Sequence, residues 1–253
     1  MTAADLALAA LAACGAGFVN ALSGGGTLLS FPALTALGLP PISANITNTI
    51  ALCPGYIGAV AAQREDLRGQ GPRLPWLLSA GAVGGVAGGV LLLTTGERTF
   101  EALIPFLILL ACVLLVLQEP LRAWLTRRSG RSSATSNSVQ RAALPVGVAA
   151  VYGGYFGAGL SSIVLAVLGL LFDDTLTRLN ALKQLIAFVV NLAAVMLFLF
   201  SGRVMWTAAL VMMAGALLGG VLGGRLATTV KPQTLRVAVV GLGVVISVVY
   251  LTR

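Results

Sequence analysis

The sequence predicts an all-α polytopic membrane protein built from two inverted-topology repeats. Composition, the spacing of apolar segments and an internal repeat support this fold class. Hydrophobic residues make up 58% of the 253 residues and charged residues only 9%, and the mean hydropathy is +0.97. A soluble domain carries roughly 25% charged residues, so this chain has too little polar surface for a water-facing globule. Intrinsic disorder is excluded as well, because it requires low hydrophobicity.

Five apolar segments follow one another in the first half of the chain. A perpendicular helix needs about 20 apolar residues to cross a bilayer, and a broken or protein-covered helix can be shorter. The first segment lacks the basic region and the processing site of a secretory signal, so we expect it to remain as a helix. The second is short because a serine-glycine stretch precedes it. The segments are Ala3–Leu22, Thr27–Leu37, Ser43–Ala62, Leu74–Thr95 and Phe100–Leu117.

A polar linker and five further segments complete the chain. Residues 119–140 are rich in serine and arginine, as in a flexible cytoplasmic loop. They separate a first transmembrane repeat, residues 1–118, from a second, residues 141–253. The second repeat also contains one short segment after a glycine-rich stretch. Its segments are Ala142–Ala158, Leu160–Phe172, Leu176–Phe200, Met205–Gly224 and Leu235–Leu251.

The two halves can be superimposed in sequence at a constant offset of 135 positions. Asn45 then aligns with Asn180, and the glycine-rich run 84–89 aligns with the run 219–224. Each half has about five helical segments, one of them short or broken, as in the internal repeats of transporters. Because five is odd, the second copy must enter the membrane in the opposite sense. The two glycine-rich runs form small-residue stripes, which we interpret as helix-packing surfaces.

The basic residues indicate the orientation in the membrane. When loops are assigned to alternate sides, twelve basic residues fall on one face and three on the other. Cytoplasmic loops are enriched in lysine and arginine, so we expect the first face to be cytoplasmic and both termini to lie outside. Topology control explains the net charge of +8 better than nucleic-acid binding, and we expect no nucleic-acid partner. The three are Arg98, Arg203 and Arg253, and the twelve are Arg64, Arg68, Arg73, Arg122, Arg127, Arg128, Arg131, Arg141, Arg178, Arg225, Lys231 and Arg236.

Two interruptions of the apolar segments are candidate recognition sites. The first is Ser23-Gly24-Gly25-Gly26-Thr27 and the second runs from Gly157 through Gly159 to Ser161 and Ser162. A broken helix is tolerated in lipid only where protein or a water-filled cavity satisfies its backbone. Each break creates a helix N-terminus with free N–H donors beside a hydroxyl group, which suits an anion. The alternative is that these glycines only allow close helix packing.

The third segment of each half carries polar residues deep in an apolar helix. Asn180, Lys183, Gln184 and Asn191 share one helix face. An intramembrane cation is costly and usually faces a cavity or a partner. The alternatives are that Lys183 extends to the cytoplasmic headgroups and that the asparagines only join helices. The first half carries Asn45, Asn48, Thr49 and Tyr56 in the matching segment.

The remaining ionisable residues exclude several classes of function. The chain has no histidine, and its three cysteines lie in apolar runs, so we expect no metal site, no cofactor and no enzymatic activity. All eight acidic residues lie at or beyond segment ends, so a carboxylate relay or a site for a cationic substrate is not expected. The membrane interior therefore favours anions.

The ordered motifs resemble the sulfite exporter TauE/SafE family over nearly the whole chain. The run from Asn20 to Thr27, Phe31-Pro32 and the run from Ala44 to Asn48 are similar to its first repeat. Tyr155-Phe156-Gly157-Ala158-Gly159, the run from Asn180 to Gln184, Gly202 and Trp206 are similar to its second. The resemblance implies a transporter of the bacterial cytoplasmic (inner) membrane for sulfite, sulfoacetate or other sulfonates. The chain departs from the more symmetric family pattern because the second break has Gly159-Leu160-Ser161 instead of three glycines.

We therefore expect a secondary transporter that alternates access to a midplane anion site between the repeats. A channel-like anion pore without alternating access is the alternative. The expected partners are a small anion and the lipid bilayer, and the sequence leaves open whether two copies form a homodimer. The candidate substrate-binding residues are Asn20, Ser23, Gly25, Gly26, Thr27, Asn45, Asn48, Thr49, Tyr56, Tyr155, Gly159, Ser161, Ser162, Asn180, Lys183, Gln184 and Asn191.

Overall fold

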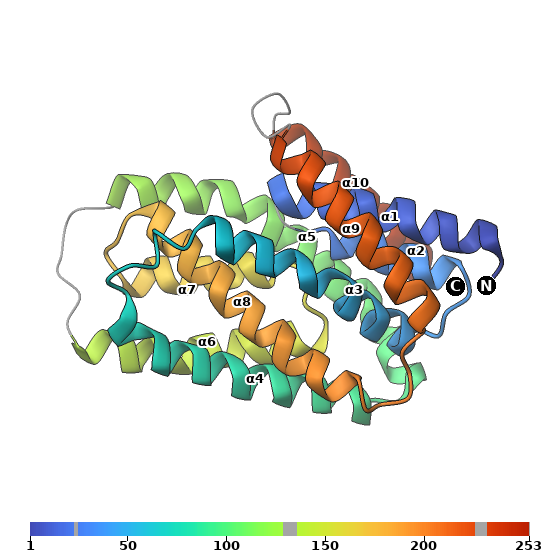
Figure 1. The fold of residues 1–253 in the computed structure, drawn as a ribbon, viewed down its shortest axis with the longest axis horizontal. Coiled ribbons are helices and arrows are strands. Elements are labelled where there is room, and N and C mark those ends of the chain that lie inside the picture. Colours follow the sequence, from blue (N-terminus) through green and yellow to red (C-terminus); the bar gives the residue numbers. More distant parts are fainter. Residues whose placement is uncertain (23–24, 129–135, 226–231, 253) are drawn as a thin grey trace.

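The computed structural model describes residues 1–22, 25–128, 136–225 and 232–252, and within these residues all regular secondary structure is helical (Figure 1). A 3-10 turn at Gly71–Arg73 precedes the fourth helix. The helices are α1 (Ala3–Leu22), α2 (Thr27–Ala36), α3 (Pro41–Ala62), α4 (Leu74–Thr94), α5 (Glu97–Arg128), α6 (Ser136–Tyr155), α7 (Leu160–Leu171), α8 (Leu176–Phe198), α9 (Trp206–Arg225) and α10 (Pro232–Leu251).

The helices match the ten predicted segments, with one difference around the linker. The helix α5 continues to Arg128 and α6 begins at Ser136, so helical turns occupy both ends of the predicted linker 119–140. The extension of α5 is held by packing, because Leu125 is buried in a cluster with Leu168 and Phe172. Hydropathy alone predicts too early an end for α5. The extension buries only one helix face, so most of its other residues are polar and the mean hydropathy falls before the helix ends.

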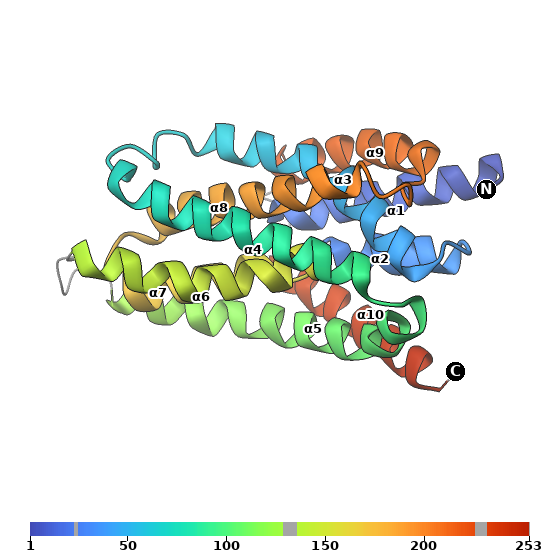
Figure 2. The same cartoon turned by 90° about the horizontal axis from the view of Figure 1, so that it is seen from below.

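Six helices of the described part are long and apolar enough to cross a membrane. They are α1, α4, α5, α8, α9 and α10, whereas α2 and α7 are short apolar helices. Figure 2 shows the long helices lying along the longest axis of the molecule, which is the arrangement of a multi-pass membrane bundle.

The two short helices return to the end from which their chains entered. The helices α1 and α2 form a hairpin that enters from the end that holds both termini, and α6 and α7 form one that enters from the opposite end (Figure 2). The turns of both hairpins lie near the middle of the bundle. A hairpin returns the chain to the side from which it entered, and two full crossings would do the same. The described loops other than the two hairpin turns therefore stay on the sides expected from alternate crossing.

Each half contributes its first helix to the other half. The helix α1 packs mainly on α9, and α6 packs mainly on α4. The helices α3 and α8 pack against each other, as do α5 and α10. If α1 to α5 are exchanged in order for α6 to α10, the same four helix pairs result. The two halves are therefore interlocked and share a buried core.

The glycine stripes are the packing surfaces that the sequence predicts. A methyl group on Gly84 or Gly88 would meet backbone carbonyl oxygens of α6, at Gly147 and Val151. The same addition at Gly219 would meet the Cys14 carbonyl oxygen of α1. These contacts allow the helix backbones to approach closely, which is how small residues stabilise helix pairs in lipid.

Candidate functional site

The first chain break separates α1 from α2 and is stabilised by a side chain. The helix α1 ends at Leu22, Gly25 has a positive φ of 89°, and Gly26 caps the N-terminus of α2. The Gly26 N–H donates a 2.7 Å hydrogen bond to Asn20 Oδ1. A methyl group at Gly26 would meet the Ala16 carbonyl oxygen, so only glycine fits there. Ser23 and Gly24, which the sequence also places at this break, lie outside the described residues.

The second break separates α6 from α7 and is stabilised by the backbone and a tyrosine. Gly157 and Gly159 have φ values of 81° and 80°, which L side chains rarely adopt. The Tyr152 carbonyl oxygen accepts from the N–H groups of Phe156 and Gly157. The Tyr152 hydroxyl donates a 2.6 Å hydrogen bond to the Ala158 carbonyl oxygen. Both predicted interruptions are therefore real helix breaks, each held by its own set of contacts.

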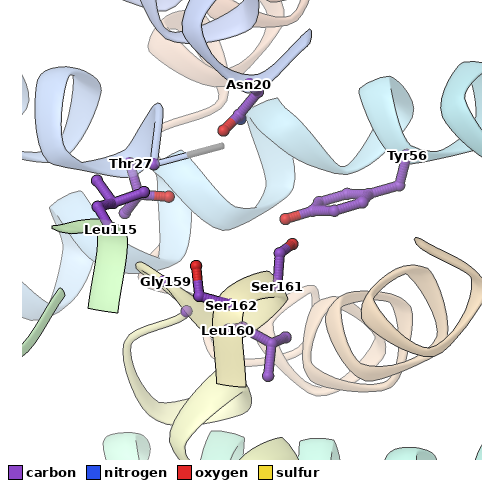
Figure 3. Close-up of a pocket in the computed structure, with 10 residues that line it drawn as sticks. Asn20, Thr27, Tyr56, Leu115, Gly159, Leu160, Ser161 and Ser162 are labelled. Carbon is purple, nitrogen blue, oxygen red and sulfur yellow. The ribbon is translucent and has the colours of Figure 1, made fainter. Parts of the chain in front are cut away.

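The two breaks face one small pocket, with a cavity volume of about 20 Å³ (Figure 3). The polar ends of the labelled side chains point toward its centre from α1, α2, α3 and α7. The pocket is lined by Asn20, Gly25, Thr27, Tyr56, Leu115, Gly157, Gly159, Leu160, Ser161 and Ser162. Residues from both halves thus build a single site.

Hydrogen-bond donors dominate this pocket. In the described part of the chain, no acceptor is found for the N–H groups of Thr27 and Ser161, which lie at the starts of α2 and α7. The described lining has no carboxylate, and the Ser162 hydroxyl donates at 3.5 Å to Gln118 Oε1 on α5. Two helix N-termini with free N–H groups provide partial positive charge, so the pocket is suited to an anion.

The predicted residues of α3, other than Tyr56, lie outside this pocket. Asn45 Nδ2 donates a 2.9 Å hydrogen bond to the Tyr155 carbonyl oxygen at the end of α6. The Thr49 hydroxyl donates to the Asn45 carbonyl oxygen within α3, and Asn48 is fully buried. Tyr155 packs in the aromatic cluster with Phe100. These contacts join α3 to the second half.

The predicted residues of α8 also lie outside the pocket. Lys183 is only 7% exposed, and its Nζ donates a 2.6 Å hydrogen bond to Asn180 Oδ1. Asn180 Nδ2 in turn donates to Gln63 Oε1 at 2.8 Å, at the end of α3. Asn191 Nδ2 donates to the Ala187 carbonyl oxygen, and Gln184 is half-buried. The burial of Lys183 argues against the alternative that it extends to the lipid headgroups.

Two residues at the site, Leu115 and Gln118 of α5, are not among those that the sequence predicts. Leu115 contacts Gly25, because a methyl group there would lie 2.6 Å from Leu115 Cδ1. It is one of many apolar residues in α5, so nothing in the sequence distinguishes it. Gln118 is a polar residue at the end of an apolar run and is buried. That combination is the signal that could have identified it.

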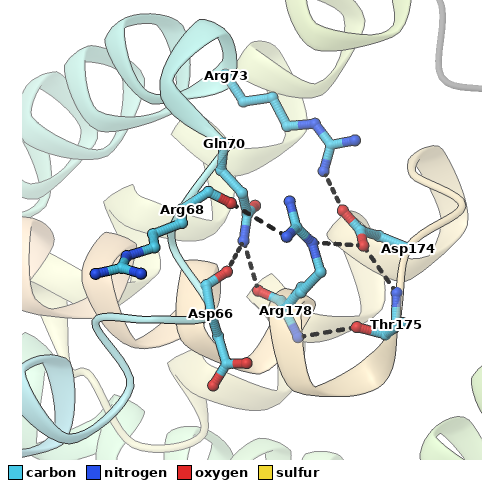
Figure 4. A network of polar contacts seen from close by, with 7 residues as sticks. All are labelled: Asp66, Arg68, Gln70, Arg73, Asp174, Thr175 and Arg178. Carbon is cyan, nitrogen blue, oxygen red and sulfur yellow. Dashed lines mark hydrogen bonds and ion pairs between the residues drawn. The ribbon is translucent and has the colours of Figure 1, made fainter.

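A polar network joins the two halves at the linker end of the bundle (Figure 4). Asp174 accepts from Arg73 at 2.6 Å and from Arg178 at 2.9 Å. The Arg178 guanidinium also donates to the Arg68 carbonyl oxygen, and the Arg73 guanidinium lies 4.7 Å from the centre of the Phe172 ring. These contacts connect the loop before α4 with the loop before α8, and so hold the halves together at this end.

At the opposite end the described ion pair between the halves is weaker. Arg203 Nη1 lies 3.8 Å from Glu97 Oε1, and both side chains are more than 40% exposed. Glu97 also accepts from the Ile42 N–H at 3.2 Å. An exposed pair at this distance contributes little to stability.

These features define a multi-pass membrane protein with a polar pocket between two helix breaks. Comparison with known proteins identifies the family, because the model of the sulfite exporter TauE/SafE family matches residues 9–250. The chain belongs to this family. No solved structure matches it significantly.

The chain is also similar to curated relatives described as probable membrane transporter proteins. A relative from Haemophilus influenzae is 32% identical over 224 residues, which cover 87% of this chain and 84% of the relative. YfcA from Escherichia coli is 26% identical over 234 residues, covering 92% and 84%. The ORF9 protein of a Sinorhizobium species is 28% identical over 226 residues, covering 88% and 83%. Family and relatives together identify a membrane transporter.

Proposed function

We propose that this transporter carries small sulfur-containing anions, such as sulfite or sulfonates, and binds them in the pocket between the two breaks. The observation that carries this proposal is the convergence of the Thr27 and Ser161 N–H groups on one pocket from opposite halves. The hydroxyls of Thr27, Tyr56 and Ser161 offer further donors there (Figure 3). Oxygen atoms of a small tetrahedral or pyramidal anion would accept from these donors.

The family supports the substrate class. The pocket has a cavity volume of about 20 Å³, room for about one water molecule, so it must widen from this conformation to hold sulfite or a sulfonate. Lys183 does not line the pocket, so we assign it a contribution through its electric field and no direct contact. Its charge lies in a low-dielectric interior, where screening is weak. The pocket lining itself is neutral, so the direct attraction for the anion comes from the two helix N-termini.

We propose that the two halves rock about this pocket, so that it opens alternately to each side. We treat the halves as inverted repeats, which agrees with the reciprocal packing of α1 on α9 and α6 on α4. Arg68, Arg73 and Arg178 lie together at the linker end (Figure 4), so by the positive-inside rule we assign this end to the cytoplasm of a bacterial inner membrane. The Asp174 network then closes the cytoplasmic side in this conformation.

Ligand-dependent thermal stability of purified protein tests the substrate class. A ligand that binds the folded state raises its apparent stability. We expect stabilisation by sulfite or a sulfonate and none by a cationic amine of similar size. If carboxylates alone stabilise the protein, the proposed substrate class is wrong. Counterflow of labelled sulfite in proteoliposomes distinguishes a carrier from a pore, because a pore does not exchange internal for external substrate against a gradient.

The substitution Asp174→Asn tests the assignment of the closed cytoplasmic side. It removes both ion pairs with arginine while keeping the size of the side chain. With Ser161→Cys introduced into a variant lacking the three native cysteines, we expect Asp174→Asn to accelerate labelling of Cys at position 161 from the linker side several-fold. Glu97→Gln, which removes the exposed pair at the other end, is the control and should leave that rate unchanged. Equal labelling rates with and without Asp174→Asn would rule out the closing role.

A further inference from the structure

Two asparagines of α3 have buried amide oxygens without a hydrogen-bond donor. Asn45 and Asn48 are each 1% exposed. Their Oδ1 atoms accept no hydrogen bond from any residue that the structure describes. A buried polar group without a hydrogen-bond partner is destabilising, because it has lost its bonds to water. Native proteins rarely tolerate this, and an ion or ordered water usually explains such a group.

The orientation of Asn45 is fixed by its surroundings. Its Nδ2 donates to the Tyr155 carbonyl oxygen at 2.9 Å. A carbonyl oxygen can only accept, so the NH₂ group must face it and the amide oxygen must face away. Asn48 follows three residues later, so the two side chains are neighbours on one helix face. The helix α6 ends at Tyr155, so the negative end of its dipole lies beside the Asn45 side chain.

The second half satisfies the matching amide oxygen with a lysine. At the repeat offset, Asn45 corresponds to Asn180 and Asn48 corresponds to Lys183. Lys183 Nζ donates to Asn180 Oδ1 at 2.6 Å. A cation attached to the chain therefore lies where the first half has a neutral amide. The first half has the same acceptor but lacks the cation.

We propose that the first half binds a monovalent alkali cation, Na⁺, through the amide oxygens of Asn45 and Asn48. Neutral amide and carbonyl oxygens at broken helices are the ligands that hold Na⁺ in transporters. A divalent cation is disfavoured, because neutral ligands cannot stabilise two charges in a low-dielectric interior and all acidic residues lie at segment ends. Bound Na⁺ would replace the ammonium that Lys183 provides in the second half.

The position of this cation links it to the anion pocket. Tyr56, which lines the pocket, lies on the same helix as Asn48, and Asn45 binds the end of α6 just before the second break. A positive charge at this place would raise the affinity of the pocket for an anion. This coupling rests on the proposed transport function, whereas the binding of Na⁺ does not.

Direct binding of ²²Na⁺ to the purified full-length protein tests the site without any anionic substrate. The measurement is made in detergent, in choline chloride buffer at constant ionic strength, with unlabelled Na⁺, Li⁺ and K⁺ as competitors. We expect saturable ²²Na⁺ binding to the wild-type protein. Removing one charge-bound ligand costs about 1.5–3 kcal/mol, so Asn45→Ala and Asn48→Ala should each weaken binding by about tenfold or more. The control Gln70→Ala removes a buried amide at the linker end of the bundle and should leave binding unchanged.

Exchange of the matched residues provides a second test. Asn48→Lys supplies a tethered ammonium, so this variant should bind no ²²Na⁺ and should have a melting temperature independent of Na⁺. Lys183→Asn should do the opposite and add Na⁺ dependence. If Asn48→Lys does not fold, Asn48→Ala and Lys183→Asn still decide the result.

Several outcomes would overturn the site. Absence of alkali-cation binding to the wild-type protein would do so, as would unchanged ²²Na⁺ affinity in the Asn45→Ala, Asn48→Ala double variant. Thermal stabilisation by sulfite, measured in choline buffer, is scored separately. Sulfite stabilisation without Na⁺ binding refutes the cation site alone, and Na⁺ binding without stabilisation by any anion refutes the proposed transport substrate alone.

Discussion

The two helix breaks reverse the chain at matching places with different chemistry. At the first break a side chain is used, because Asn20 Oδ1 accepts from the Gly26 N–H. At the second break two glycines with positive φ turn the backbone, and the Tyr152 hydroxyl holds the Ala158 carbonyl oxygen. The first break therefore uses one of its own donors to stabilise itself. Each break leaves one N–H group for the pocket, that of Thr27 or of Ser161, and the second break adds two hydroxyls to the lining where the first adds one.

This difference teaches that two helix breaks can have similar shapes without sharing the residues that produce them. The pocket needs two helix N-termini directed at one point, and each half achieves this with the residues it has. We infer that the second break carries more of the anion affinity and that the first break is the more sensitive to added volume. Substitutions at the two breaks test both parts of this comparison.

The largest effect is expected from Gly26→Ala. The added methyl group meets the Ala16 carbonyl oxygen and lies 2.8 Å from the Asn20 side chain, so the backbone must shift. Overpacking of this kind costs about 1–3 kcal/mol, and loss of the Asn20 hydrogen bond adds to it. We expect a strong drop in melting temperature and in monodisperse protein on size exclusion.

Two glycine variants serve as comparisons for this prediction. Gly159→Ala should be milder, at about 1–2 kcal/mol for the positive φ, because the nearest atom, Leu114 Cδ1 at 3.1 Å, can move. Gly58→Ala is the control, because nothing lies within 4 Å of the added group. A Gly159→Ala protein less stable than Gly26→Ala would reverse the proposed order of sensitivity.

An intermediate effect is expected from the hydroxyl groups. A hydrogen bond to a charged group contributes about 1.5–3 kcal/mol, so loss of the Ser161 hydroxyl in Ser161→Ala should weaken sulfite binding by about 10- to 100-fold. Thr27→Val at the first break should weaken it by about tenfold. Isothermal titration of each purified variant measures the dissociation constants. Equal losses at the two breaks would show that they share the anion evenly.

The smallest effects are expected from the residues that hold the turns. Asn20→Ala leaves the Gly26 N–H without its acceptor and should lower the free energy of unfolding by about 1 kcal/mol. The affinity for sulfite should be kept or increased, because this N–H group is then available to the pocket. Tyr152→Phe removes only the hydrogen bond to the Ala158 carbonyl oxygen and should cost about 1 kcal/mol or less. Thermal melts with and without sulfite separate the two readouts. Weaker sulfite binding in Asn20→Ala would mean that Asn20 contacts the anion directly.

Much of the architecture follows from the sequence, because a bilayer leaves few choices. Long apolar runs must form helices there, since no water is present to satisfy the backbone. The predicted segments Leu74–Thr95 and Leu176–Phe200 accordingly agree with the ends of α4 and α8 to within a few residues. Glycine clusters between apolar runs marked both breaks for the same reason. The glycine stripes also predicted close helix packing, because a small residue can be recognised without knowing its partner.

The tertiary structure decided which polar residues meet. Asn20, Thr27, Tyr56, Ser161 and Ser162 come from four helices, and only the packing of α1, α2, α3 and α7 around one point brings them together. Lys183 is hydrogen-bonded to Asn180, three residues earlier on α8, and lies outside the pocket, although the sequence predicted it as a residue of the site. Helical periodicity gives the face of a residue on its own helix. It does not show which neighbour that face meets, because the partner is determined by long-range packing. Local sequence patterns therefore predict the membrane helices, whereas the residues of the pocket depend on the tertiary structure.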